Sequence, residues 1–210
     1  MITNMLITKI ITLLLFCLSS TACGTGSQVS AVPLEDVRTH ISRMGVQPTE
    51  HIVVVDIKKQ TLALIHGNQI QQMYTISTSK RGPGQKVDTF QTPQGLHRIN
   101  EKIGEGIPHY GIFHRRQFIG VWQRKPRHQH LKDYVSTRIL RLEGLQPGFN
   151  RGRDNRGRIV DTAQRAVYIH GTTMEWKLGA PSTKGCVHMR ADDVIRLFNS
   201  VPVGTLVWIH

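Results

Sequence analysis

The sequence predicts a mainly β fold with a few helices, of the α+β class, and three observations lead to this prediction. Apolar runs with the period of strands recur from His51 onward and are separated by turn signals. Apolar residues at helical spacing occur in two short stretches, one before His51 and one after Met189. With 210 residues, of which 39% are hydrophobic, the chain can bury one substantial core. We therefore expect one main domain, residues 51–210, preceded by a short appendage.

The first 22 residues have the composition of a secretory signal peptide. One charged side chain, Lys9, precedes the apolar run Ile10–Leu18, which is too short to cross a membrane as a mature helix. The pair Ala22-Cys23 then resembles a bacterial lipobox, although Ser20 stands where an aliphatic residue is usual. Lipidation of Cys23 is therefore favoured over cleavage by an ordinary signal peptidase. We expect a periplasmic or cell-envelope protein that is anchored to a membrane as a lipoprotein.

Residues 23–50 are expected to hold the lipidated cysteine, a tether and a short helix. Gly24–Val32 is small and polar, as flexible tethers are. Leu34, Val37, Ile41 and Met44 recur at helical spacing and predict a short helix that packs on the main domain.

The β prediction for the main domain begins with an antiparallel meander. Its three runs are HIVVVD, QTLALIHG and QIQQMYTIS, and the turn signal His66-Gly67-Asn68 separates the last two. Proline in Thr92-Pro93-Gln94-Gly95 predicts a turn. Further strands are expected at Leu96–Ile99, Gly111–Trp122, Arg138–Leu142, Val167–Ile169 and Thr205–Ile209.

The last helix is predicted after Met189. Asp192 and Asp193 suit the first turn of a helix, and Val194, Leu197, Phe198 and Val201 form an apolar stripe behind them. Pro202 and Gly204 are expected to end this helix.

Positive charge is concentrated in one part of the chain. Between Arg115 and Arg158 there are twelve basic and three acidic side chains, so this segment holds +9 of the formal +13. Such a surface attracts polyanions, including acidic cell-wall polymers. Export and the lack of interleaved aromatic and basic residues argue against a nucleic-acid partner. His114, His128 and His130 lack cysteine partners and helical HExxH spacing, so no metal site is expected.

Cys186 is the main candidate for a catalytic nucleophile. Cys17 lies in the signal peptide and Cys23 is the candidate for lipid, which leaves Cys186 as the free thiol of the mature chain. His170 precedes it by sixteen residues (186 − 170) and can supply the base that a thiol nucleophile needs. We expect His170 and Gly171 at the end of a strand, and backbone N–H groups near Gly185 and Cys186 that lower the thiol pKa and bind an oxyanion. The alternative is a buried, inert thiol.

These residues resemble the motif of the YkuD-type L,D-transpeptidases, which make cross-links in the bacterial cell wall. The matching residues are His170-Gly171-Thr172 and Thr183-Lys184-Gly185-Cys186-Val187-His188-Met189, and the resemblance extends from about His51 to the C-terminus. It implies a β-sandwich catalytic domain and no cofactor. It also implies that Cys186 forms a thioester with a peptidoglycan stem tetrapeptide, releases the terminal D-amino acid and passes the acyl group to an amine. His170 would be base and acid, with its ring oriented by the Gly171 carbonyl.

Four further residues are expected to bind the oxyanion or the substrate: Thr183, Lys184, Gly185 and His188. Lys184 stands where the family has histidine, and His188 stands where it has arginine or asparagine. Two alternatives remain open at this point, namely a hydrolase of stem peptides or wall-protein links, and a catalytically silent lipoprotein that binds peptidoglycan. The sequence leaves the acyl acceptor, the choice of inner or outer membrane and the oligomeric state undetermined.

Overall fold

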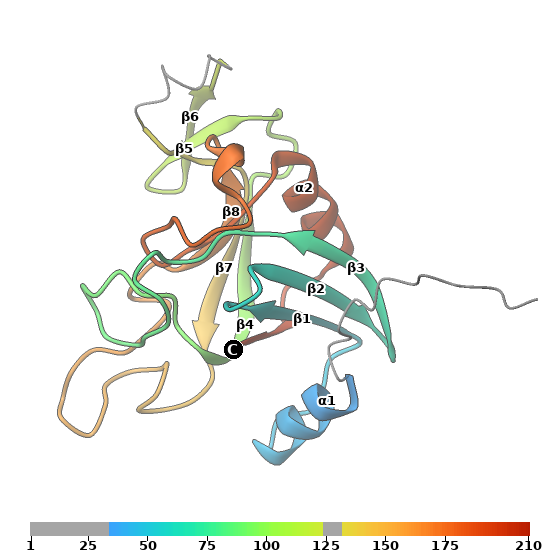
Figure 1. The fold of residues 1–210 in the computed structure, drawn as a ribbon, viewed down its shortest axis with the longest axis vertical. Helices are drawn as coiled ribbons and strands as arrows, with labels where there is room; N and C mark the ends of the chain where they lie inside the picture. Colours follow the sequence, from blue (N-terminus) through green and yellow to red (C-terminus); the bar gives the residue numbers. More distant parts are fainter. Residues whose placement is uncertain (1–33, 124–131) are drawn as a thin grey trace, which may run out of the picture. The chain divides into compact units, whose positions relative to one another are not determined.

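Ten strands form one hydrogen-bonded sheet in the part of the chain that the computed structural model describes, residues 34–123 and 132–210 (Figure 1). The predicted signal peptide and Cys23 lie outside the described residues, as do His128 and His130. The strands are β1 (His51–Asp56), β2 (Thr61–His66), β3 (Gln69–Thr75), β4 (Gly95–Ile103), β5 (Gly111–His114), β6 (Gln117–Val121), β7 (Val135–Gly144), β8 (Tyr168–Thr172), β9 (Val187–Met189) and β10 (Leu206–Ile209). The described helices are α1 (Leu34–Arg43) and α2 (Ala191–Ser200), with a 3-10 turn η2 (Glu175–Lys177) between β8 and β9. The prediction of a mainly β fold with a short N-terminal helix is confirmed.

The sheet places the chain's last strand at its centre. Its main path runs β3-β2-β1-β10-β4-β7-β5-β6, and β8 and β9 branch from β7. The meander β1-β2-β3 is antiparallel as predicted, whereas β10 pairs parallel with β1 and antiparallel with β4. The apolar run near the C-terminus therefore forms a mostly buried strand, β10, between β1 and β4, as its composition predicts.

Strands β1 and β2 are buried on both faces, which explains their continuous apolar runs. Val53 and Val55 face a core shared with β8, β9 and α2. Ile52 and Val54, on the opposite face, pack with Val37 and other residues in a second core beside α1. This layering packs β8 and β9 against the meander, in the manner of a sandwich, and two backbone hydrogen bonds between His188 and Ser77 join β9 to the segment that follows β3.

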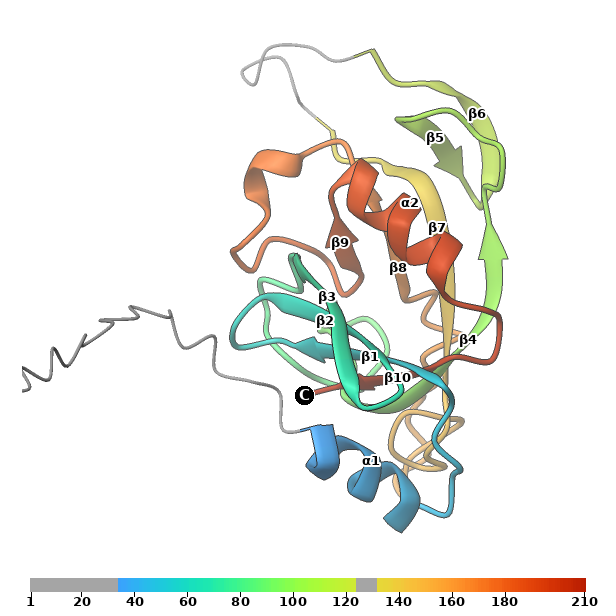
Figure 2. The same cartoon turned by 90° about the vertical axis from the view of Figure 1, so that its right-hand side faces the viewer.

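Strand β8 runs further than the sequence predicts. His170 and Gly171 lie inside the strand, which continues to Thr172, so the prediction that they end it is wrong. The reason is non-local, because β7 pairs with one edge of β8 and β9 pairs with the other. In the parallel β8–β9 register His170 lies opposite His188, and Cys186 immediately precedes β9. Figure 2 shows α2 covering β7 and β8 on the core side.

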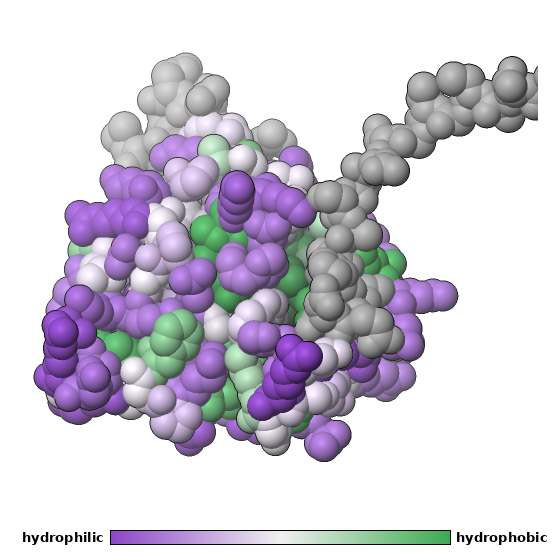
Figure 3. All heavy atoms as spheres, turned by 60° about the horizontal axis from the view of Figure 1, so that its bottom comes forward, coloured by the Kyte–Doolittle hydropathy of each residue, from purple (hydrophilic) through white to green (hydrophobic). Residues whose placement is uncertain are grey.

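Hydrophilic side chains dominate the face drawn in Figure 3, with smaller hydrophobic patches between them. Elsewhere, β6 exposes three large apolar side chains, Phe118, Ile119 and Val121. Neither helix among the described residues is both long and apolar enough to cross a membrane.

Candidate active site

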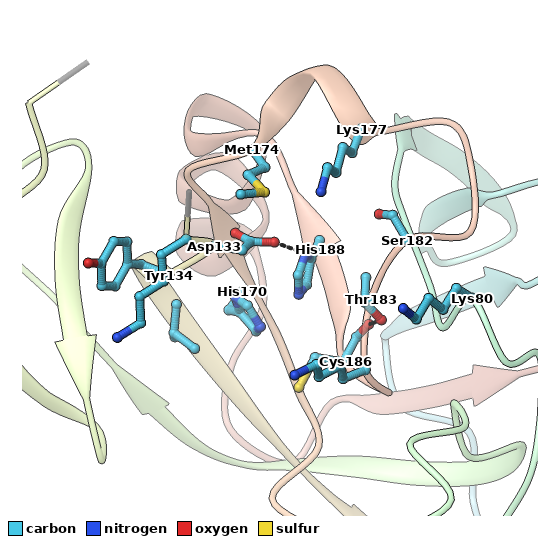
Figure 4. A pocket seen from close by; sticks show the side chains of 13 residues that line it. Lys80, Asp133, Tyr134, His170, Met174, Lys177, Ser182, Thr183, Cys186 and His188 are labelled. Carbon is cyan, nitrogen blue, oxygen red and sulfur yellow. Dashed lines mark hydrogen bonds and ion pairs between the residues drawn. The ribbon is translucent and has the colours of Figure 1, made fainter. Parts of the chain in front are cut away.

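A cavity of about 570 Å³ brings together residues from segments far apart in the sequence (Figure 4). Its volume is in the range of pockets that bind small molecules and peptides. The predicted pair His170 and Cys186 both line it, as do Thr183, Lys184 and His188. The remaining lining residues are Lys80, Lys132, Asp133, Tyr134, Val135, Met174, Lys177 and Ser182. The predicted catalytic pair and three of the predicted substrate-binding residues therefore share one cavity.

His170 is held as a neutral base. Its side chain is buried, and its Nδ1 lies 2.8 Å from the Gly171 carbonyl oxygen. Since a carbonyl can only accept, Nδ1 carries the proton and Nε2 keeps a free lone pair. Burial lowers the pKa of His170, while the Gly171 bond and the Asp133 carboxylate oppose this effect. The ring is thus uncharged near neutral pH and can accept a proton at Nε2.

Cys186 is a protonated thiol in this state. Burial raises its pKa to about 11, against opposing effects of the Tyr168 backbone and the Arg165 guanidinium. Its Sγ lies 3.7 Å from the Ala166 carbonyl oxygen. Among the described residues, no hydrogen bond joins the Cys186 sulfur to the His170 ring. The prediction of a lowered thiol pKa is therefore wrong, because desolvation outweighs the nearby donors and charge. A thiolate can form here only as a base removes the proton.

The turn before Cys186 is fixed by hydrogen bonds to side-chain hydroxyls. Thr183 Oγ1 donates to the Cys186 carbonyl over 2.7 Å and accepts from the Gly185 N–H over 3.1 Å. Thr92 Oγ1 donates to the Gly185 carbonyl over 3.0 Å. Gly185 has a φ of +119°, and a Cβ added to it would lie 3.2 Å from the Gln91 carbonyl oxygen. Only glycine fits this position without strain.

The same contacts identify the available oxyanion donor. The Gly185 N–H is already engaged by Thr183, so it is a poorer candidate than expected. The Cys186 N–H has no acceptor among the described residues. Thr183 holds the turn and does not offer a free hydroxyl to a substrate. The Cys186 N–H, next to the nucleophile, is therefore the better candidate among these donors for binding an oxyanion.

His188 extends the site beyond the predicted pair. Its ring lies 4.5 Å from the His170 ring, and its Nδ1 lies 3.4 Å from Asp133 Oδ2. Burial lowers the pKa of His188 well below its usual value, and the neighbouring His170 and Lys177 lower it further. His188 is therefore neutral. Thr172 Oγ1 donates to the other oxygen of Asp133 over 2.5 Å, which helps to hold the carboxylate next to His188.

Asp133 is the residue that the sequence alone does not single out. It stands between Lys132 and Tyr134, next to the start of β7, and no local spacing ties it to His170 or Cys186. The structure brings it to the site because β7 pairs with β8. Lys80 and Lys177 enter the cavity in the same non-local way. Lys184, which is exposed, lies with its Nζ 6.0 Å from the centre of the Phe90 ring.

Comparison with known protein families gives an extended match. The family model of the YkuD domain, described as the L,D-transpeptidase catalytic domain, matches residues 50–209.

Relatives with L,D-transpeptidase names are also similar in sequence. YqjB of Bacillus subtilis is 26% identical over 163 residues, which cover 77% of this chain and 72% of YqjB. ErfK/SrfK of Salmonella typhimurium is 44% identical over 127 residues, which cover 57% of this chain and 40% of that protein.

Solved structures are also among the matches. Bd1075 of Bdellovibrio bacteriovorus matches with a TM-score of 0.48 and 17% identity over 77% of this chain and 48% of its own. An L,D-transpeptidase from Mycobacterium smegmatis matches with a TM-score of 0.44 and 16% identity over 79% of this chain and 60% of its own. This chain thus spans about half to three fifths of these two solved chains.

Proposed function

Since the chain belongs to the YkuD L,D-transpeptidase family, we propose that its domain is a cysteine acyltransferase that cross-links peptidoglycan stem peptides. The acyl donor is a stem tetrapeptide with an L-to-D peptide bond. Cys186 is the nucleophile, His170 is the general base and acid, and the Gly171 carbonyl is the group that orients the imidazole.

The first half-reaction forms a thioester. Cys186 Sγ attacks the donor carbonyl carbon while His170 Nε2 takes the thiol proton, so that a C–S bond forms. The oxygen becomes an oxyanion next to the Cys186 N–H. The C–N bond then breaks, and His170 returns the proton to the leaving amine, which departs as the terminal D-amino acid.

The second half-reaction consumes the thioester. An amine of an acceptor stem attacks the thioester carbonyl, gives a proton to His170 Nε2 and forms a new peptide bond. The C–S bond breaks, and the proton returns to the sulfur. With water in place of the amine, the same steps hydrolyse the stem, which is the second candidate function.

The observation that carries this proposal is the state of the two groups that share the cavity. His170 is neutral with its free lone pair on Nε2, and Cys186 is a thiol that needs a base to react. A proton transfer coupled to attack fits both groups, whereas a preformed thiolate does not. In the imidazolium state that follows, Asp133 supplies compensating negative charge, which raises the pKa of His170.

Product analysis tests the proposal. The purified domain and its Cys186→Ala variant are incubated with tetrapeptide-containing muropeptides, and the products are identified by mass. Dimers that lack one terminal D-amino acid support transfer, and shortened monomers support hydrolysis. Unchanged substrate with the intact protein would contradict both enzymatic functions and favour a silent peptidoglycan-binding protein. The Cys186→Ala variant should leave the substrate unchanged.

We also propose export and lipid anchoring through Cys23, on the strength of the signal-like N-terminus and its Ala22-Cys23 pair. The measurement is the intact mass of the mature protein from the membrane fraction. An N-terminal lipid on Cys23 is expected, and an unmodified chain in the aqueous fraction would contradict the proposal.

A further inference from the structure

We infer that the lysines around the cavity select an acyl donor with free carboxylates, and that donors with the corresponding carboxamides are poor substrates. The inference rests on the proposed acyl transfer and adds the chemical class of peptide that the site prefers. It is carried by the arrangement of charge around Cys186.

Four lysines from four different segments converge on this one cavity. Lys80 follows β3, Lys132 precedes β7, Lys177 ends η2 and Lys184 lies in the turn before Cys186. Figure 4 shows Lys80 and Lys177 entering from different sides of the space next to Thr183 and His188. The convergence therefore does not come from a single basic run in the sequence.

The cavity has one acid to balance these charges. Among the described residues that line it, Asp133 is the single acidic one, and the oxygens of Asp133 contact Thr172 and His188. None of the four ammonium groups has a carboxylate partner within 4.0 Å among the described residues. The site thus presents unpaired positive charge to whatever enters it.

Contacts with aromatic rings orient two of the lysines without neutralising them. Lys132 Nζ lies 5.0 Å from the centre of the Tyr134 ring, and Lys184 Nζ lies 6.0 Å from that of Phe90. Such contacts leave the charge intact and available to an anion. Lys177 also acts across the cavity, since its charge helps to lower the pKa of His188.

The donor is the substrate that these charges meet first. Because Cys186 and His170 both line this cavity, the peptide whose carbonyl is attacked must lie in it before any acceptor reacts. Carboxylates on either side of the scissile bond then lie among ammonium groups. Amide groups at those positions would gain hydrogen bonds but no charge pairing.

A matched pair of synthetic tetrapeptides tests the inference. The two donors share the backbone, the L-to-D bond and the terminal carboxylate, and differ in whether their interior acidic groups are carboxylates or carboxamides. Release of the terminal D-amino acid without acceptor measures the first half-reaction. We expect kcat/KM to be about tenfold higher for the carboxylate donor, as the sum of several exposed charge pairs. The difference should lie mainly in KM and should shrink with added salt.

Lysine variants assign the effect to the cavity. Lys80→Gln, Lys177→Gln and Lys184→Gln should each lower kcat/KM for the carboxylate donor about two- to fivefold, and should lower it less for the carboxamide donor, so that the ratio between the two donors shrinks. All three side chains are exposed, so these substitutions should leave folding intact. Lys58→Gln, an exposed lysine that lines no part of the cavity, is the matched control and should change neither donor.

Three results would overturn the inference while leaving acyl transfer in place. They are equal rates for the two donors, an undiminished carboxylate preference in the triple glutamine variant, and a preference that depends on carboxylates of the acceptor alone.

Binding of the same peptides to the Cys186→Ser protein, measured by calorimetry, separates the two proposals. Tighter binding of the carboxylate peptide supports the recognition even where turnover fails, and equal binding contradicts it. Turnover of neither donor by the wild-type protein contradicts the proposed function instead.

Discussion

Replacing Gly185 with alanine should slow acyl transfer far more than it destabilises the fold. The residue has a φ of +119°, which L-amino acids rarely adopt, and an added Cβ would lie 3.2 Å from the Gln91 carbonyl oxygen. That carbonyl cannot easily retreat, because it accepts a hydrogen bond from Arg165 Nη2 over 2.5 Å. The strain is therefore relieved by movement of the turn that carries Cys186.

The magnitudes of the two effects differ. Backbone strain of this kind costs about 1–3 kcal/mol, and each kcal/mol lowers Tm by about 2–4 °C in a domain of this size. A shift of about 1 Å in the nucleophile and its backbone N–H can lower the rate on the order of 100-fold. We therefore expect a moderate loss of thermal stability together with a loss of about 100-fold in kcat.

The assay compares Gly185→Ala with Gly204→Ala. Gly204 also has a positive φ, +96°, but an added Cβ there has no atom within 4 Å, and the residue lies outside the cavity. Both variants should lose similar stability by thermal unfolding, while Gly204→Ala keeps its turnover. Full turnover by a Gly185→Ala protein that is as destabilised as the control would refute the link between this turn and the chemistry.

Three further predictions follow from the site and its surroundings. The rate of Cys186 alkylation by iodoacetamide should rise about tenfold per pH unit until the pH nears the thiol pKa of about 11. A rate that reaches its plateau by pH 7 would instead indicate that the thiolate is already formed. Thr183→Val should lower the free energy of unfolding in urea by about 1–3 kcal/mol and reduce turnover, because the Gly185 N–H and the Cys186 carbonyl lose their partner. Thr183→Ser, which keeps the hydroxyl, should stay near wild type. Equal losses in both variants would contradict the role of the hydroxyl. Burial lowers the pKa of His97 from 6.5 to about 4, so the unfolded chain binds a proton that the folded chain excludes. As the pH falls from about 6.5 to 4, His97 should therefore lower the free energy of unfolding by up to about 3 kcal/mol. In His97→Gln the free energy of unfolding should depend less steeply on pH across this range, and an unchanged slope would contradict the assignment.

Local sequence patterns predict the strands well where burial is uniform. The runs HIVVVD and TLALIH are apolar throughout because β1 and β2 have a core on each face, and this composition is visible without a structure. The helix after Met189 is equally visible from its apolar stripe and first-turn acids.

Features that depend on pairing between distant segments are not visible in this way. The extent of β8 depends on β7 and β9, so the position of His170 within the strand could not be predicted from Val167–Ile169 alone. The same holds for Asp133, whose role depends on the pairing of β7 with β8.

The pKa of Cys186 shows a different limit. Glycine and a nearby helix suggest free N–H groups, but the raised thiol pKa comes from desolvation, which is a property of the assembled cavity. The hydrogen bond from Thr183 to the turn likewise depends on a backbone conformation that spacing does not specify.

The central claim, a thioester on Cys186, is tested most directly by mass spectrometry of the intact protein mixed with a donor tetrapeptide and no acceptor. We predict an added mass equal to the donor minus its terminal D-amino acid, located on the peptide that contains Cys186 and absent from Cys186→Ala. No adduct under conditions where the donor binds, or an adduct that persists in Cys186→Ala, would contradict the account.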